Sequence, residues 1–255
     1  MRNKPVVLVT RPQGQGQPLS DALISRGYPC QSLPLLQLHG LEALSSEAEQ
    51  HLAQLDQFQH IIFISTNAVH YGMPRLASAG TLPVDAQWYA IGSATAGRLS
   101  EHGVAVTAAA GPMTTESLLA HPSLRDLAGQ RVLIVKGVGG RISLRKGLQS
   151  RGARVDEFEC YRRQCPSMAT GALLKYLTEW QIGLILISSG EGLNNMVELL
   201  GGSLTHDVAL LPLVVPSTRV LEQAGELGFK NVQQAVNASD PAVLDAVEAW
   251  WQASL

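Results

Sequence analysis

Short, continuous runs of apolar residues recur along the chain, and each leads into a polar loop and then a helix-like stretch. The clearest runs are 6–9, 61–64, 132–135 and 184–187. A strand is apolar throughout when both of its faces are buried, as in a parallel sheet covered by helices. The alternation of such strands with helical segments predicts an α/β protein with parallel sheets.

The chain also resembles itself at an offset of 125 residues, which carries position 7 to position 132. Val7-Leu8-Val9 falls on Val132-Leu133-Ile134, and a helical stretch that ends at Gly103 matches one that ends at Gly228. A period of about half the chain is too long for a solenoid and indicates two similar α/β domains.

The repeat leaves open where the domains divide, because each repeat could be one domain or the chain could cross over midway and return. Segments 32–39 and 157–164 are both strand-like and occupy the same place in their repeats, which suits a two-stranded connector. Pro34 fits an edge position because it cannot donate to a central ladder. We therefore expect two similar flavodoxin-like parallel-sheet domains joined by a two-stranded β connector. The expected parts are a discontinuous first domain of 1–34 and 167–255, an inserted second domain of 41–156, and a connector of 35–40 and 157–166.

Composition and charge narrow the class of protein. The 255 residues are 45% hydrophobic, enough for a substantial core, while a net charge of −2 and 5% aromatic residues argue against nucleic-acid binding. The apolar run at 6–9 is too short for a signal peptide, and the longest apolar stretch elsewhere is broken by Pro212. Cys30, Cys160 and Cys165 form no CxxC motif and are typical of a reducing compartment. We expect a cytoplasmic protein with no membrane segment.

Motifs for metal or nucleotide binding are missing from the sequence. None of the seven histidines has a second His or Cys at a ligand spacing. Gly14-Gln15-Gly16 follows a strand, but Pro18 interrupts the rest of a GxGxxG motif. The loop from Gly137 to Arg141 has two interpretations: a tight turn that needs positive φ, or a loop whose N–H groups face an anion. We expect no metal and no organic cofactor.

Hydroxyl residues follow the predicted strands in both halves of the chain. They are Ser65, Thr66, Ser93, Thr95, Ser189, Ser217 and Thr218. Such residues are ordinary helix N-caps. The carboxyl ends of strands are also where open α/β sheets bind ligands. If the two domains face each other, these residues would line the two walls of one cleft.

Basic residues gather between Arg125 and Arg163. This segment has ten basic and four acidic residues, a balance of +6 that leaves −8 for the rest of the chain. Solvated helix faces account for some of them, such as Arg145 and Lys146. The alternative interpretation is the attraction of a polyanionic small molecule.

Six segments along the chain form an ordered set of motifs. They are VLVTRP at 7–12, FISTNAV at 63–69, IGSATA at 91–96, KGVGGR at 136–141, ECYRR at 159–163 and SSGE at 188–191. Taken together, these motifs resemble the uroporphyrinogen-III synthase family of tetrapyrrole biosynthesis. The resemblance runs along nearly the whole chain. It implies two α/β domains with the active site in the cleft between them, in a monomer that needs no metal or organic cofactor.

The resemblance also implies a reaction, the closure of the linear tetrapyrrole hydroxymethylbilane to uroporphyrinogen III with loss of water. Loss of the ring A hydroxyl gives an azafulvene, which the substituted α-carbon of ring D attacks to form a spirocyclic pyrrolenine. Fragmentation and re-addition then invert ring D. Closure through the free carbon gives isomer I, so the main task of the enzyme is to hold ring D. The substrate would arrive by transient hand-over from hydroxymethylbilane synthase. The alternative function is a non-enzymatic two-domain binding protein for a polyanionic ligand.

Site residues follow from the same resemblance. Tyr161 matches the family's cleft tyrosine and is expected to donate a proton to the leaving hydroxyl; the alternative is a connector tyrosine that packs against apolar surface. Arg11 could equally be structural. The residues expected to bind substrate carboxylates are Arg11, Ser65, Thr66, Ser93, Thr95, Lys136, Gly137, Arg141, Ser189, Ser217 and Thr218.

Overall fold

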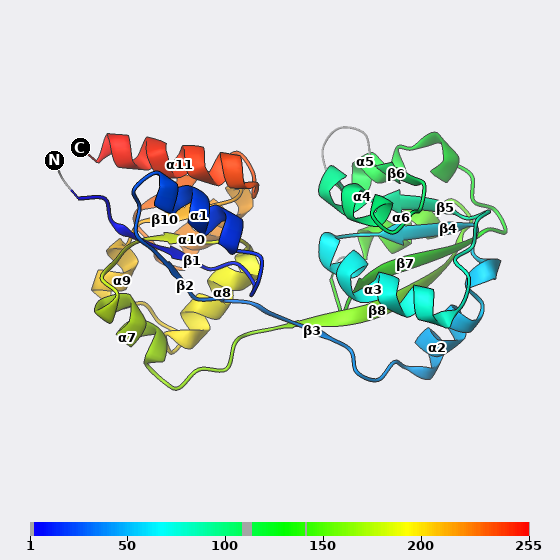
Figure 1. The fold of residues 1–255 in the computed structure, drawn as a ribbon, viewed down its shortest axis with the longest axis horizontal. Helices are drawn as coiled ribbons and strands as arrows, with labels where there is room; N and C mark the ends of the chain where they lie inside the picture. Colours follow the sequence, from blue (N-terminus) through cyan, green and yellow to red (C-terminus); the bar gives the residue numbers. More distant parts are fainter. Residues whose placement is uncertain (1–2, 109–113, 141, 255) are drawn as a thin grey trace. The chain divides into compact units, whose positions relative to one another are not determined.

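The chain forms two compact units in a computed structural model that describes residues 3–108, 114–140 and 142–254 (Figure 1). Unit 1 combines the start of the chain, up to Gln37, with everything from Gln164 onward. Unit 2 is the continuous segment Leu38–Arg163. The chain therefore leaves unit 1 once, builds all of unit 2, and returns.

Unit 1 is a parallel sheet with the strand order β11-β10-β9-β1-β2. Its strands are β1 (Val6–Val9), β2 (Cys30–Ser32), β9 (Ile182–Leu186), β10 (Leu213–Val215) and β11 (Val232–Gln234). Its helices are α1 (Gln17–Ser25), α7 (Ala172–Glu179), α8 (Gly190–Leu199), α9 (His206–Leu210), α10 (Thr218–Glu226) and α11 (Asp240–Ala253).

Helices cover both faces of this sheet, which explains its continuously apolar strands. Val7 and Val9 of β1 pack with α1 and α11 on one face, where the two helices lie side by side (Figure 1). Leu8 points to the opposite face and packs with α7, α8 and α10. Successive side chains of a strand alternate between faces, so burial on both sides leaves no polar position.

Unit 2 has the strand order β3-β8-β7-β4-β5-β6. Its strands are β3 (Gln37–Gly40), β4 (His60–Phe63), β5 (Gln87–Ala90), β6 (Val106–Ala108), β7 (Arg131–Gly137) and β8 (Arg154–Gln164). Its helices are α2 (Ser46–Ala53), α3 (Thr66–Ala79), α4 (Ser93–Ser100), α5 (Thr115–Leu119) and α6 (Ser143–Gln149), with short 3-10 helices at Leu55–Gln57 and Pro122–Leu124.

Both faces of the second sheet are covered as well. Ile61 and Phe63 of β4 pack with α2, α3 and α4, whereas Ile62 packs with α5 and α6. The prediction of an α/β fold with two parallel-sheet units is confirmed. Among the described residues, no helix is both long and apolar enough to cross a membrane.

The two segments expected to form a connector are neighbours in the structure. β3 lies beside β8 in the sheet, and the N–H of Leu41 donates to the carbonyl of Cys160 at 3.1 Å. β8 is longer than expected, because it also pairs in parallel with β7 from Arg154 to Tyr161. Phe158 and Cys160 point into the core of unit 2, so this stretch is a strand of its sheet in addition to a link between units.

The internal repeat corresponds to a shared topology. In unit 1, β1-α1-β2 forms one end of the sheet; in unit 2, β7-α6-β8 takes the same place at the 125-residue offset. The remaining strands, β9 to β11 and β4 to β6, match in the same way. Each unit therefore combines the first half of one repeat with the second half of the other.

Candidate functional site

The predicted site residues of unit 2 lie at the carboxyl ends of neighbouring parallel strands. β7, β4 and β5 are adjacent in the sheet, so the residues that follow them share one edge, where open α/β sheets bind ligands. Ser65 and Thr66 follow β4, Ser93 and Thr95 follow β5, and Gly137 ends β7. Thr95 is buried, whereas Ser93 is exposed at the start of α4.

Ser65 has two partners at this edge. It is the N-cap of α3, and its Oγ accepts a hydrogen bond from the N–H of Ala68 at 3.1 Å. The same oxygen lies 3.3 Å from the hydroxyl of Tyr161, which reaches it from β8. Tyr161 is only 2% exposed. The phenol is therefore held near the amino end of a helix, where negative charge that develops on it is stabilised.

Tyr161 also packs against a residue that the sequence does not single out. The rings of Tyr71, in α3, and Tyr161 are stacked, with centroids 5.4 Å apart and planes 21° apart. The hydroxyl of Tyr71 donates to the carbonyl of Leu38 in β3 at 3.1 Å. In the sequence, Tyr71 is an ordinary aromatic residue of a helix, and only the fold brings it against Tyr161.

Lys136 has a partner of its own. It lies in the buried part of β7, its side chain is 6% exposed, and its Nζ lies 3.1 Å from Glu157 Oε1. Arg145 approaches the other oxygen of the same carboxylate at 3.6 Å. The charge of Lys136 is thus balanced inside unit 2, on the side of the sheet that carries α6. Arg141, the other basic residue predicted for this loop, lies outside the described residues.

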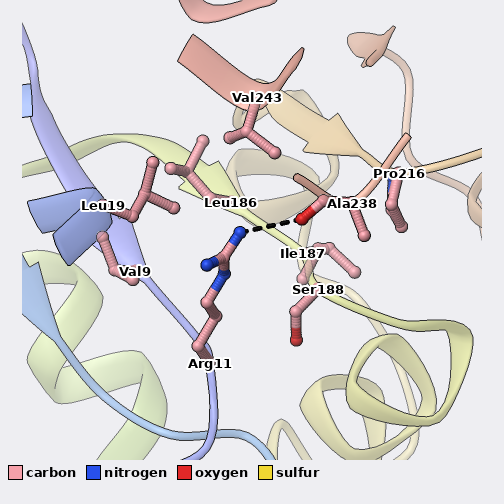
Figure 2. A pocket seen from close by; sticks show the side chains of 9 residues that line it. All are labelled: Val9, Arg11, Leu19, Leu186, Ile187, Ser188, Pro216, Ala238 and Val243. Carbon is pink, nitrogen blue, oxygen red and sulfur yellow. Dashed lines mark hydrogen bonds between the residues drawn. The ribbon is translucent and has the colours of Figure 1, made fainter. Parts of the chain in front are cut away.

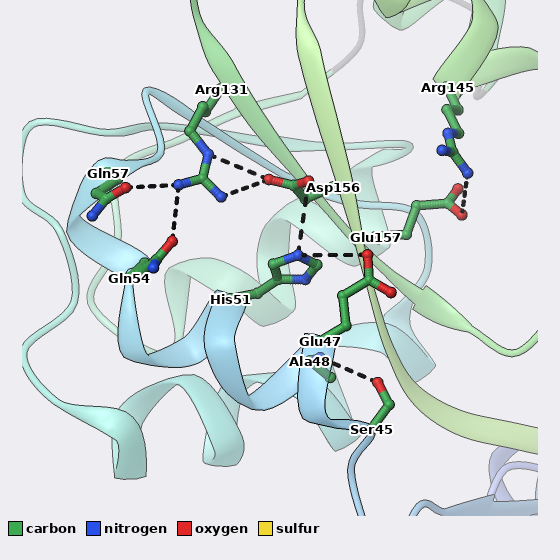
Figure 3. Close-up of polar contacts among 10 residues, drawn as sticks. All are labelled: Ser45, Glu47, Ala48, His51, Gln54, Gln57, Arg131, Arg145, Asp156 and Glu157. Atoms are coloured by element: carbon green, nitrogen blue, oxygen red, sulfur yellow. Dashed lines mark hydrogen bonds and ion pairs between the residues drawn. The ribbon is translucent and has the colours of Figure 1, made fainter.

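An open groove of about 350 Å³ lies between α2 and β8 (Figure 3). The acidic residues that line it are Glu47, Asp156, Glu157 and Glu159. Arg145 is its basic residue, and this side chain is already directed at Glu157. A groove with this charge repels a carboxylate-rich ligand, so it does not suit the polyanion that the sequence suggested.

Several basic residues of the positive segment have partners within unit 2. Arg131 donates to Asp156 at 2.7 Å, and Arg145 lies 3.6 Å from Glu157 (Figure 3). Arg151 donates to the main-chain carbonyls of Leu119, at the end of α5, and of Leu124, at the end of the second 3-10 helix. These contacts support a structural interpretation for these members of the segment.

The glycine-rich loop after β7 is a tight turn, and two of its N–H groups donate to acceptors within unit 2. Gly139 and Gly140 have φ values of 72° and 92°, which a residue with a side chain rarely adopts. The N–H of Val138 donates to the carbonyl of Tyr161 at 2.8 Å. The N–H of Gly139 donates to the carboxylate of Glu159 at 3.0 Å. The loop does face an anion, but this anion is a side chain of the protein.

Unit 1 repeats the arrangement of strand ends. β1, β9 and β10 are adjacent, and Ser189 and Ser217 follow the last two of them. Ser189 caps α8 by accepting from the N–H of Gly192 at 3.0 Å. Ser217 has nearly the same backbone angles at the start of α10, yet its side chain makes no capping hydrogen bond. Thr218, the next residue, is exposed.

Arg11 follows β1, and its side chain bonds to residues of its own unit (Figure 2). Its guanidinium pairs with Asp240 at the start of α11 and donates to the carbonyl of Ala238 at 2.9 Å. The hollow beside it, which Ser188 and Pro216 help to line, holds about 10 Å³. That volume barely admits one water molecule. These contacts favour the structural interpretation of Arg11.

The pKa values of the three cysteine thiols do not favour a role as nucleophiles. All three are free thiols. Burial raises the pKa of Cys160 to about 12 and that of Cys30 to about 11, and it also raises the pKa of Cys165. A thiol that stays protonated is a weak nucleophile and a poor metal ligand. Within the part of the chain that the structure describes, no three His, Cys, Asp or Glu side chains are grouped to hold a metal ion.

A family model described as uroporphyrinogen-III synthase HemD matches residues 17–245, which is most of the chain and spans both units. The chain belongs to the uroporphyrinogen-III synthase family. It is thus an enzyme of porphyrin biosynthesis, a cyclising hydro-lyase that acts on a tetrapyrrole, and the alternative of a non-enzymatic binding protein is set aside.

Relatives and solved structures agree with this assignment. The uroporphyrinogen-III synthases of Salmonella typhimurium and Escherichia coli are each 32% identical over 250 residues, covering 95% of this chain and 99% of theirs. The fold is similar to that of a mutant uroporphyrinogen III synthase from Thermus thermophilus, with a TM-score of 0.67, 16% identity and coverage of 98% of this chain and 99% of that one. The Helicobacter pylori enzyme gives a TM-score of 0.63 at 14% identity, over 96% of this chain and 99% of that one.

Proposed function

We propose that this member of the family closes hydroxymethylbilane to uroporphyrinogen III, with inversion of ring D and loss of one water molecule. The observation that carries the site assignment is the contact between the Tyr161 hydroxyl and Ser65 Oγ, 3.3 Å apart at the amino end of α3. It brings a proton donor to the strand edge where open α/β sheets bind ligands.

Tyr161 acts on the first step of the reaction. The electron pair of the ring A pyrrole nitrogen expels the hydroxyl as its C–O bond breaks, and the phenol supplies the proton that converts the leaving group into water. The amino end of α3 and a hydrogen bond from Ser65 then stabilise the phenolate. The proton released from the pyrroles as the macrocycle closes returns to this oxygen, so that only water is lost overall.

Substrate carboxylates bind at the strand ends of both units. Helix amino ends present unpaired N–H groups and a partial positive charge, which favour anions. The residues that we assign to this task are Ser65, Thr66, Ser93, Thr95, Ser189, Ser217 and Thr218. Ser217 is a strong candidate because its hydroxyl does not cap its own helix. Lys136 and Arg11 have acidic partners already, and we assign them to the support of β7 and β1.

Three further features of the enzyme are proposals that follow from family membership. We propose that it acts as a monomer in the cytoplasm, and that it takes hydroxymethylbilane by transient hand-over from hydroxymethylbilane synthase. The free state of Cys30, Cys160 and Cys165 supports a reducing compartment. Sedimentation of the purified protein, alone and with the synthase, tests the first and the last of these features.

The decisive experiment is an analysis of the product isomers. Hydroxymethylbilane is generated in place by its synthase, this protein is added, and the oxidised products are separated into isomers I and III. We expect isomer III to predominate. If a folded sample gives only isomer I, at the rate measured without protein, the proposed reaction is wrong.

The variant Tyr161→Phe then tests the proton donor. We expect its kcat to fall by about 100-fold, the lower range for a general acid.

A further inference from the structure

Two glycines and two tyrosines form a layered stack across the sheet of unit 2, and one of the tyrosines is the proposed proton donor. Gly137 in β7 is the register partner of Tyr161 in β8. A Cβ atom on Gly137 would lie 2.7 Å from Tyr161 Cζ and 3.0 Å or less from both Cε atoms. The ring of Tyr161 therefore lies directly on the main chain of Gly137, in space that any side chain would occupy.

The other side of the Tyr161 ring is covered by Tyr71. The two rings are stacked at 5.4 Å, and Tyr71 comes from α3, the helix that Ser65 begins. Tyr71 is held in turn by β3, because its hydroxyl donates to the carbonyl of Leu38 and a Cβ on Gly40 would lie 3.1 Å from Tyr71 Cδ1. The order of contacts is Gly137, Tyr161, Tyr71, Gly40.

This stack restrains the direction of the phenol. The ring cannot move toward β7 without meeting the Gly137 main chain, and it cannot move the other way without meeting the ring of Tyr71. Stacked aromatic pairs of this geometry contribute beyond their buried area. With the ring confined between two layers, the hydroxyl is directed along the sheet to the end of β4, where it meets Ser65.

We infer that Gly137 and Tyr71 are positioning residues that hold the Tyr161 hydroxyl at Ser65. This inference rests on the proposed function, and it gives Gly137 a different task from the binding of substrate carboxylates. If Gly137 bound substrate, its substitution would raise KM. If it positions Tyr161, its substitution lowers kcat and leaves KM unchanged, because only the proton transfer is affected.

The first test is Gly137→Ala, assayed for isomer III. We expect kcat to fall by about 100-fold, because a displacement of about 1 Å in a positioned group can cost that much. In the Tyr161→Phe background the same substitution should have no further effect, because the hydroxyl that it displaces is already gone. Gly97→Ala is the matched control. It makes the same chemical change in unit 2 at an exposed helix position where a Cβ meets nothing within 4 Å.

The second test separates the two features of Tyr71. Tyr71→Phe keeps the stacked ring and loses only the hydrogen bond to Leu38, whereas Tyr71→Leu removes the ring. We expect Tyr71→Phe to retain most of kcat and Tyr71→Leu to lose it as Gly137→Ala does. Thermal unfolding of each variant identifies any loss that comes from unfolding alone.

A third measurement reports on the ring independently of activity. The protein is labelled with 3-fluorotyrosine, and the ¹⁹F resonance of Tyr161 is assigned through Tyr161→Phe. Gly137→Ala and Tyr71→Leu should shift this resonance, and Gly97→Ala should leave it in place. An unchanged resonance in Gly137→Ala contradicts the inference.

The remaining outcomes are also decisive. A rise in KM with kcat unchanged, or losses from Gly137→Ala and Tyr161→Phe that multiply in the double variant, would overturn the inference, because Gly137 would then act without Tyr161. A wild-type rate in Tyr161→Phe overturns it too, since the stack would position nothing of use. If the wild-type protein makes no isomer III, the proposed function fails, while the ¹⁹F measurement still decides whether the stack holds the ring.

Discussion

His60 is a buried histidine at the start of β4, at the opposite end of this strand from Ser65. Its Nδ1 lies 3.3 Å from the hydroxyl of Tyr89, and its Nε2 contacts the side-chain oxygen of Gln130. Burial lowers the pKa of His60 below its ordinary value of 6.5, and the hydrogen bond to Gln130 offsets part of this effect. The folded protein therefore favours the neutral imidazole.

This burial predicts a loss of stability in mild acid. Because the unfolded chain binds the proton more readily, the contribution of neutral His60 is fully present above about pH 6.5 and is lost as the pH falls from there through the lower folded pKa. Urea unfolding at a series of values from about pH 8 to about pH 5 measures it. His60→Gln should flatten this decline, whereas His102→Gln, at an exposed site in the same unit, should not. Equal slopes for the wild type and both variants would contradict the prediction.

The sequence pattern does not predict which side chains pair when the two residues are far apart along the chain. Ser65 and Ser189 are predictable because a hydroxyl residue directly after a buried strand is a local signal for a cap. The pairing of Arg11 with Asp240 joins positions 229 residues apart, and only the packing of α11 brings them together. A basic residue carries no local mark of whether its partner is a ligand or a distant carboxylate of the same chain.

At the scale of elements, three helices begin with serine in nearly the same extended conformation. Ser65, Ser189 and Ser217 have φ values of −162°, −162° and −168°. The first two accept a hydrogen bond from the N–H three residues on, and Ser217 makes no such bond. A serine after a buried strand therefore caps its helix in two cases and leaves its hydroxyl without a capping bond in the third.

Substitution of Ser189 and Ser217 by alanine should show which of the two hydroxyls stabilises its helix as a cap. Ser189→Ala removes a cap and should lower the free energy of unfolding by about 1 kcal/mol. Ser217→Ala removes no capping bond, so its effect on unfolding without substrate should be only a few tenths of a kcal/mol, about the scale of a neutral surface change. If we have assigned Ser217 correctly, the same variant raises the KM for hydroxymethylbilane. Equal destabilisation by both substitutions would show that Ser217 is an ordinary cap.

The strands with the strongest apolar runs were the most predictable elements. The run 6–9 coincides with β1, and 132–135 lies within β7. β8 was harder, because charged and buried residues alternate from Glu157 to Cys160 as in a half-exposed connector. Its parallel pairing with β7 depends on a long-range register, which local sequence does not specify.

At the scale of the whole molecule, the internal repeat gives the two units the same strand order. The strand orders β11-β10-β9-β1-β2 and β6-β5-β4-β7-β8 are equivalent, but one is assembled from both ends of the chain and the other from a continuous segment. The periodicity predicted two similar units and could not say how they divide, because either assignment buries the same faces. The contacts of each core decide it: those of unit 2 join residues within 38–163.

This organisation predicts that unit 2 folds without unit 1. The segment 38–163 contains both of its core clusters and every member of the stack from Gly137 to Gly40. Expressed alone, it should unfold cooperatively in urea, and its ¹⁹F resonance for Tyr161 should match that of the full chain. It should make no isomer III, because we assign part of the substrate binding to Ser189 and Ser217 of unit 1. The matched comparison is the segment 164–255, which lacks two neighbouring strands of its sheet, β1 and β2, and should not fold cooperatively. A segment 38–163 without a cooperative transition would mean that unit 2 depends on contacts with the rest of the chain.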